Sequence, residues 1–236
     1  MAIANGRRAE LGLPAIERLG DIHDACACAL VAAPKEFEPG VPEAANVLRI
    51  GAVLDAPPLC CEVDEVEVRA GSTPLVLVSL STSEQGQADL LQRCVDAVAQ
   101  LPVNAIVTTG PSIDPASVTA GANTQVARYV PHAEILPSAS LVITHAGFGT
   151  TMAALGHGVP LLCTPLGRDQ YFNAERVQDL GAGRTLMPDA DSDAIALAAK
   201  DILADSRFTA EAKRMADAIG GYGGAARAAG ALEALA

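Results

Sequence analysis

The hydrophobic pattern of this chain becomes regular at Pro74. The segment Leu75–Leu80 (LVLVSL) is an almost continuous apolar run, which is typical of a strand buried on both faces of a parallel sheet. In Ala88–Ala99, apolar residues recur at helical spacing instead. The alternation continues downstream and predicts strands at 105–107, 125–129, 141–144, 161–164 and 184–187, and helices at 150–156, 170–180, 193–203 and 209–219. Alternating strands and helices predict an α/β fold with a doubly wound, Rossmann-like parallel sheet.

The pattern divides the chain into four segments. Residues 1–58 hold a short helical pattern and two strand-like stretches, Ala29–Ala32 and Val47–Leu54, which is little for an independent domain. Residues 59–73 are acidic and bounded by Gly and Pro, which indicates an interdomain linker. We expect the α/β domain to occupy residues 74–215 and a C-terminal helix to occupy residues 216–236.

Composition restricts the ligands and the environment. The net charge of −12 argues against binding a nucleic-acid backbone, so any phosphate must be held by a local feature. The six cysteines show neither C-x-x-C nor zinc-finger spacing, and we expect most of them to be small buried side chains in a reduced protein. No apolar stretch approaches the roughly 20 residues that span a bilayer. These features predict a soluble, cytoplasmic protein without a membrane span.

The most informative junction lies in residues 141–160, LVITHAGFGTTMAALGHGVP. A strand ends before His145, and a helix is expected from Thr150. Gly147 and Gly149 allow a ligand to approach the backbone closely, and the helix start offers N–H groups and a positive dipole end. A diphosphate is the natural occupant of such a site, with His145 as an additional donor. Strand-Gly-x-Gly-helix turns are also common without a ligand, and Met152 replaces the third glycine of the dinucleotide fingerprint.

Two neighbouring loops join this junction in a recognisable order. Arg128–His132 ends one strand with an aromatic residue, and residues 158–170 carry the next strand to Asp169 and Gln170. With these motifs, residues 74 to about 186 resemble the donor-binding domain of the family-one glycosyltransferases, UDP- or TDP-sugar-dependent enzymes that include the antibiotic- and macrolide-type members of actinobacteria. The resemblance implies a GT-B fold, of which this chain would supply the C-terminal half. Residues 1–58 would be the remnant of the N-terminal acceptor domain.

The resemblance also implies roles for particular residues. The residues expected at the donor diphosphate are His145, Gly147, Gly149, Thr150, Ser81 and Thr82. Those expected at the nucleoside are Tyr129, Val130 and His132. Those expected at the sugar are Asp169 and Gln170. Each has an alternative role in the fold itself. Tyr129 would otherwise cap the core, His132 would begin a helix, and Asp169 would be a helix N-cap.

Two departures from the family pattern bear on activity. Ala153 stands where the family often has a Glu that grips the ribose, which favours a deoxyribose nucleotide such as TDP. The family's general base is a His near the start of the N-terminal domain, so no catalytic residue is expected in this chain. No metal site is expected either, because Asp189-Ala-Asp191 precedes a helix start and is explained by capping.

The resemblance implies an inverting, metal-independent transferase that moves a hexose from a nucleoside diphosphate sugar to a hydroxyl acceptor. This chain would bind the donor, with no other cofactor, and would be inactive alone. Its acceptor would bind through the missing N-terminal domain, and an uncovered apolar face would favour self-association. Two alternatives are a stand-alone donor-binding subunit of a split enzyme and a non-catalytic nucleotide-binding fragment. A nucleotide-sugar epimerase shares the fold but has no specific support here.

Overall fold

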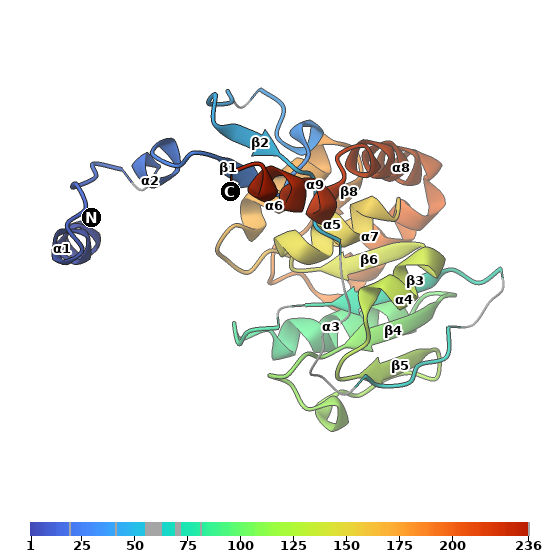
Figure 1. The fold of residues 1–236 in the computed structure, drawn as a ribbon. Coiled ribbons are helices and arrows are strands. Elements are labelled where there is room, and N and C mark those ends of the chain that lie inside the picture. The colour runs from blue at the N-terminus through green and yellow to red at the C-terminus, as the bar shows by residue number, and fades with distance from the viewer. Residues whose placement is uncertain (19, 41, 55–62, 69–71, 81, 236) are drawn as a thin grey trace. The chain divides into compact units, whose positions relative to one another are not determined.

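The structure is a computed structural model (Figure 1). It describes the whole chain apart from residues 19, 41, 55–62, 69–71, 81 and 236. The chain divides into two compact units, one made of Met1–Val53 with Gly221–Ala236 and the other of Leu54–Gly220. Of the expected linker 59–73, only residues 63–68, 72 and 73 are described. None of the helices in the described part of the chain has both the length and the apolar character needed to cross a membrane.

The larger unit is built on a parallel sheet. Its described strands are β3 (Leu75–Ser79), β4 (Asn104–Thr108), β5 (Thr124–Ala127), β6 (Leu141–Thr144), β7 (Leu161–Cys163) and β8 (Gly183–Thr185). They lie in the order β5-β4-β3-β6-β7-β8. The chain therefore runs outward from β3 to β5 and then returns to the other side of β3. This confirms the doubly wound sheet, whose switch point lies between β3 and β6.

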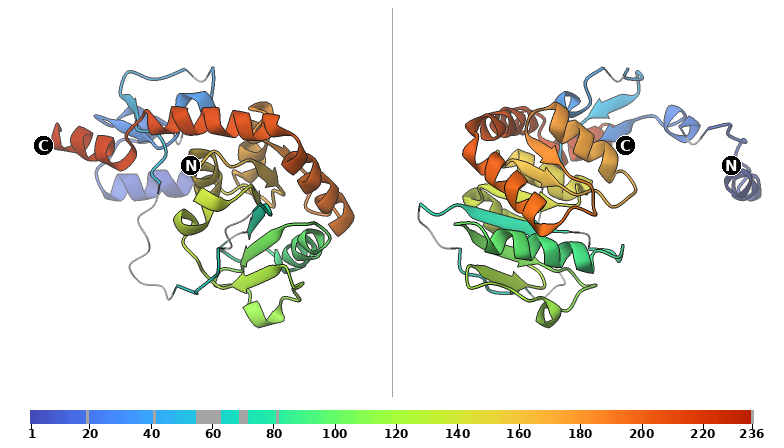
Figure 2. Two further views of the ribbon diagram at one scale, coloured as in Figure 1. Left: turned by 90° about the vertical axis from the view of Figure 1, so that its right-hand side faces the viewer. Right: turned by 180° about the vertical axis from the view of Figure 1, so that it is seen from behind.

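Helices cover both faces of this sheet. They are α3 (Ala88–Ala99), α4 (His132–Ile135), α5 (Phe148–Gly156), α6 (Gln170–Asp179), α7 (Ser192–Ala204) and α8 (Ser206–Gly220), with short 3-10 turns at Pro115–Ser117 and Leu136–Ser138. On one face α3 and α7 lie side by side over the strands (Figure 2). On the other, α5 is flanked by α4, α6 and α8.

The core of the larger unit follows from the periodicities in the sequence. The predicted apolar stripe of α3 is buried against alternate residues of the strands, among them Val76 and Val78. Cys94 and Cys163 are small buried side chains, as expected, and burial raises the pKa of each thiol to about 12. In the smaller unit Cys26 is exposed and Cys28 is half-buried, and Cys60 and Cys61 lie outside the described residues.

Several strand boundaries differ from the prediction by one or two residues, and two of them have a steric or hydrogen-bonding reason. β8 begins at Gly183, earlier than predicted, where a Cβ atom would lie 2.1 Å from the carbonyl oxygen of Leu161. Only glycine permits this close approach of two backbones. β5 was predicted to reach Tyr129 but ends at Ala127, and the N–H groups beyond it have a side-chain partner instead of the neighbouring strand.

The smaller unit pairs the N-terminal segment with the end of the chain. It contains α1 (Ala2–Glu10), α2 (Asp21–Asp24), β1 (Ala29–Val31), a 3-10 turn (Lys35–Phe37), β2 (Val47–Arg49) and α9 (Gly224–Glu233). β1 and β2 are parallel. The Tyr222 hydroxyl accepts a hydrogen bond from the backbone N–H of Lys35 and donates one to Glu36, both at 2.9 Å. Residues 216–236, expected as one helix, comprise the end of α8, a turn at Gly221–Gly223 and α9.

Candidate functional site

The carboxyl ends of the central strands bring hydroxyl and imidazole groups together. Ser79 is in register with Thr108 on one side and with Thr144 on the other. The Thr108 hydroxyl donates to Ser79 Oγ at 2.9 Å, and Ser79 Oγ lies 3.1 Å from Nε2 of His132. His145 follows Thr144 directly. Two of the predicted ligand-binding histidines therefore flank the end of β3 at the switch point of the sheet.

The loop between β6 and α5 has an unusual backbone. Ala146 is fully buried and has a φ of 62°, a left-handed conformation that costs a non-glycine residue free energy. The turn lets the helix begin at Phe148, two residues before the predicted start at Thr150. Gly149 and Thr150 therefore lie in the first helical turn, where N–H groups have no carbonyl partner within the helix. The first intrahelical bond is donated by Thr151 to Gly147 at 3.0 Å.

His145 lies directly over Gly147. The side chain of His145 is 8% exposed, and a Cβ atom on Gly147 would be 2.6 Å from its Nε2 atom. Glycine is thus needed at 147 to make room for the imidazole. Burial lowers the pKa of His145 below 6.5, and Arg168 lowers it further, whereas Asp169 and a hydrogen bond to the Ser79 backbone oppose the shift. The neutral ring has a single N–H to donate.

Asn173 is a site residue that the sequence analysis did not identify. Its side chain is 2% exposed, and Nδ2 donates to the Ala146 carbonyl at 3.0 Å and to Asp169 Oδ2 at 2.9 Å. Asn173 therefore connects the left-handed turn before α5 with the predicted sugar-binding carboxylate. The spacing from Asp169, four residues or one helical turn, is the signal that would have pointed to it.

Asp169 and Gln170 occupy the start of α6. Asp169 is the N-cap residue but makes no side-chain capping bond, so capping does not account for its carboxylate. The Gln170 side chain is 2% exposed, and its Oε1 accepts from the N–H groups of Leu166 and Gly167 at 2.8 and 3.0 Å. Its Nε2 donates to Gln85 at 3.0 Å. Gln170 thus organises its own loop and connects it to the loop after β3.

A second contact joins the same two loops. Arg168, which has a φ of 57°, donates to Ser83 Oγ at 3.2 Å. In the loop after β3, Thr82 is described and its carbonyl lies 3.5 Å from the Ser112 hydroxyl, whereas Ser81 lies outside the described residues. The loops after β3 and β7 are therefore joined by two side-chain hydrogen bonds beside His145.

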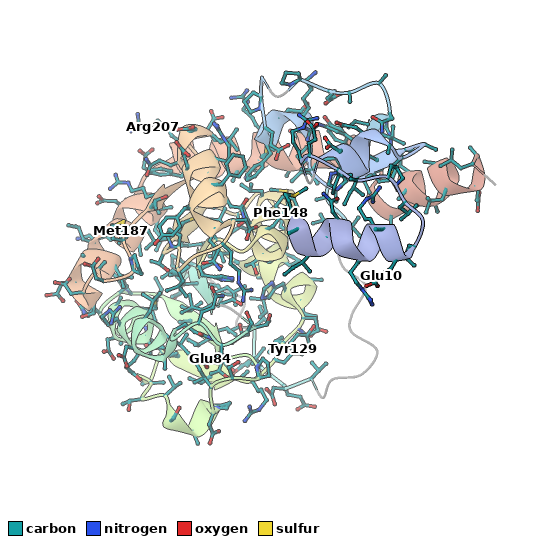
Figure 3. The ribbon with its side chains drawn as sticks, turned by 90° about the vertical axis from the view of Figure 1, so that its left-hand side faces the viewer. Glu10, Glu84, Tyr129, Phe148, Met187 and Arg207 are labelled. Atoms are coloured by element: carbon teal, nitrogen blue, oxygen red, sulfur yellow. The ribbon has the colours of Figure 1, made fainter. Side chains whose placement is uncertain are left out.

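The predicted nucleoside residues follow β5. Tyr129 is half-buried, Val130 is buried, and His132 begins α4 with its imidazole directed at Ser79. Figure 3 labels Glu84 in the loop after β3, Tyr129 in the loop after β5 and Phe148 at the start of α5. Because all the strands of this sheet are parallel, the predicted phosphate, sugar and nucleoside residues within the described part lie together at the carboxyl ends of the strands.

Two further predictions concern carboxylates and metal ions. Asp191 is the N-cap of α7, and its side chain accepts from the Ala194 N–H at 2.8 Å, which confirms the capping interpretation for Asp191. Within the described residues, no three His, Cys, Asp or Glu side chains are grouped so that they could hold a metal ion.

Comparison with known proteins identifies the family. A family model described as the erythromycin biosynthesis protein CIII-like, C-terminal domain matches residues 92–235. The chain belongs to this family. The chain is 31% identical over 177 residues to the NDP-glycosyltransferase YjiC of Bacillus subtilis. That match covers 74% of this chain and 45% of the relative, so the chain spans about half the length of the curated relatives it matches.

Solved structures show the same architecture. The calicheamicin glycosyltransferase CalG4 is 26% identical with a TM-score of 0.80, over 99% of this chain and 58% of that one. The spinosyn rhamnosyltransferase SpnG, solved in complex with thymidine diphosphate, is 23% identical with a TM-score of 0.75, over 97% of this chain and 60% of that one. The EryCIII-like domain therefore has the fold of the C-terminal half of a GT-B glycosyltransferase, which confirms the resemblance seen in the sequence.

Proposed function

We propose that this chain is the donor-binding half of an inverting, metal-independent glycosyltransferase that uses a UDP- or TDP-hexose. The observation that carries the proposal is the junction of β6 and α5. There, the first-turn amides of Gly149 and Thr150 and the imidazole of His145 lie at the switch point of the sheet. The complex of SpnG with thymidine diphosphate supports a nucleoside diphosphate as the ligand of this fold.

The diphosphate becomes the leaving group in the proposed reaction. An acceptor hydroxyl attacks the anomeric carbon, the bond from that carbon to the diphosphate oxygen breaks, and negative charge develops on the diphosphate. Helix N-terminal amides stabilise this charge beside the imidazole of His145, and their positions are fixed before the reaction. We also assign Thr82 and Ser81, of which only Thr82 lies within the described residues, to phosphate binding. The fixed turn at Ala146 supports this assignment, because it sets the direction of α5.

The remaining residues divide between the sugar and the nucleoside. Asp169, held by Asn173, accepts hydrogen bonds from hexose hydroxyls, and Gln170 shapes the loop beside it. Tyr129 stacks on the base, whose edge meets the Val130 backbone. His132, hydrogen-bonded through Nε2 to Ser79, lies on the ribose side.

On this proposal, the acceptor-binding site and the general base lie in polypeptide outside these residues. We infer that residues 1–58 belong to the acceptor domain, 59–73 to the linker and 74–215 to the donor domain. On this proposal the chain alone binds donor without transferring sugar, and it acts with an N-terminal domain or with a separate partner subunit. A second copy of the chain is a further candidate for covering its apolar surface, and light scattering over a range of concentrations tests that association.

Calorimetric titration with UDP, TDP, GDP and their hexose derivatives tests the proposal. We expect UDP or TDP to bind, and sugar transfer to small hydroxylated acceptors to be at background without a second protein. Absence of binding to every nucleotide would contradict donor binding. Transfer by the chain alone would contradict the need for a second domain.

A further inference from the structure

The acidic segment 63–68 lies along the outer edge of the sheet. The N–H of Asp64 donates to the Tyr129 carbonyl at 3.0 Å. The N–H of Glu67 donates to Gln125 Oε1, and Gln125 Nε2 donates back to the Glu67 carbonyl, both at 2.8 Å. Because residue 64 pairs with 129 and residue 67 with 125, the segment runs antiparallel to β5. It thus lies alongside the edge strand, bonded to one side chain of β5 and to the backbone just beyond its end.

Asp64 makes the contacts that extend beyond the end of β5. Its Oδ2 accepts from the backbone N–H of Arg128 at 2.6 Å and of Tyr129 at 3.0 Å. Both the N–H and the carbonyl of Tyr129 are therefore bonded to Asp64. Hydrogen bonds to a carboxylate are shorter and stronger than those between neutral groups. Together with the bond from the Gly110 N–H to the Arg128 carbonyl at 2.9 Å, they fix the backbone just beyond β5.

We propose that Asp64 is a positioning residue of the nucleoside subsite. This role rests on the proposed function, in which Tyr129 stacks on the base and Val130 meets its edge. The carboxylate of Asp64 presets the backbone that carries both residues. A preset backbone lowers the ordering cost of binding. The benefit falls on ligands that carry a base, and not on the diphosphate, which is held at α5. A segment distant in sequence from the donor loops thus determines recognition of the nucleoside.

Three variants separate this role from a general structural one. Asp64→Ala removes the acceptor, whereas Asp64→Asn keeps an amide oxygen that accepts from the same two N–H groups. Glu65→Gln is the matched control, because Glu65 is an exposed acid in the same segment. Calorimetry with UDP, TDP and inorganic pyrophosphate measures the base-dependent part of binding. Amide hydrogen exchange measures the protection of Arg128 and Tyr129.

We expect Asp64→Ala to weaken UDP or TDP binding about tenfold and to leave pyrophosphate binding within about twofold of the wild type. Asp64→Asn should restore most of the loss, and Glu65→Gln should behave as the wild type. Protection of the Arg128 and Tyr129 amides should fall in Asp64→Ala only. Equal weakening of pyrophosphate and nucleotide would overturn the proposal, as would unchanged nucleotide affinity or unchanged protection.

The same measurements distinguish a failure of the proposed function from a failure of the role assigned to Asp64. If the wild-type chain binds pyrophosphate but neither UDP nor TDP, both the donor-binding proposal and the nucleoside role of Asp64 are wrong. If the wild type binds nucleotide and Asp64→Ala binds it equally well, only the role of Asp64 is wrong.

Discussion

The Asn173 side chain donates a hydrogen bond to the carbonyl of Ala146, which is held in a left-handed conformation. Both residues are buried, so the carbonyl depends on this partner. The bond connects α6 to the turn from which α5 begins, and it places the first-turn amides of α5 relative to Asp169. A donor bound across both helices would depend on this connection.

Replacing Asn173 with Ala should lower the free energy of unfolding. The variant leaves a buried carbonyl without a partner, which costs about 1–3 kcal/mol. Urea denaturation measures the change. Glu175→Ala, on the exposed side of the same helix, is the control and should stay within about 0.5 kcal/mol of the wild type. Equal stabilities of the two variants would contradict the role assigned to Asn173.

Two glycines of the phosphate loop should respond differently to alanine. In Gly147→Ala the new methyl group meets the buried imidazole of His145, so we expect a loss of about 1–3 kcal/mol and weaker nucleotide binding. In Gly149→Ala the methyl group enters open space on a helix, where Ala is favoured over Gly by up to about 1 kcal/mol. Thermal and urea unfolding of the pair checks this contrast in stability, and calorimetry of UDP and TDP measures the weaker binding of Gly147→Ala. If Gly149→Ala were the less stable protein, the steric argument would be wrong.

The lowered pKa of His145 predicts a pH-dependent stability. The unfolded chain binds the proton near the usual value of 6.5, whereas the folded protein binds it only at lower pH. The contribution of His145 to the free energy of unfolding is therefore fully present above pH 6.5. It is lost as the pH falls through that value toward the pKa of His145 in the folded protein. Urea unfolding of wild type and His145→Gln at about pH 7.5 and 5.5 isolates this contribution. The stability of the wild type relative to the variant should decrease at the lower pH, and an unchanged difference would show that the folded pKa is not lowered.

Ala153 offers a test of nucleotide preference. A Glu at this position would accept hydrogen bonds from ribose hydroxyls, each worth about 0.5–1.5 kcal/mol, and TDP has lost one of these hydroxyls. We expect only a small preference, in the direction of TDP, and UDP binding at least about tenfold tighter than TDP would contradict the inference from Ala153. Ala153→Glu should strengthen UDP binding more than TDP binding, as measured by calorimetry. Because Ala153 is 7% exposed, unfolding of the variant must be measured in parallel. An equal effect on both nucleotides would rule out the ribose contact.

The sequence by itself determined the alternating elements, the buried strands and the order of the donor loops. These features depend on local periodicity and on residues adjacent in sequence, such as the apolar run of β3 and the glycines around α5. The bounds of α3 and β6 match their predicted ranges because the apolar pattern starts and stops sharply there.

Only the tertiary structure decided which distant side chains hold the loops in place. Asn173 meets Ala146 across 27 positions, and Asp64 meets Tyr129 across 65, so no local pattern reports either pairing. The same limit applies to the start of α5. The sequence pattern predicts Thr150 and the helix begins at Phe148, because glycine disfavours helix in isolation and Gly149 lies between the two positions. There, the left-handed turn at Ala146 and its bond to another helix set the helix start, and the free energy of those contacts comes from packing.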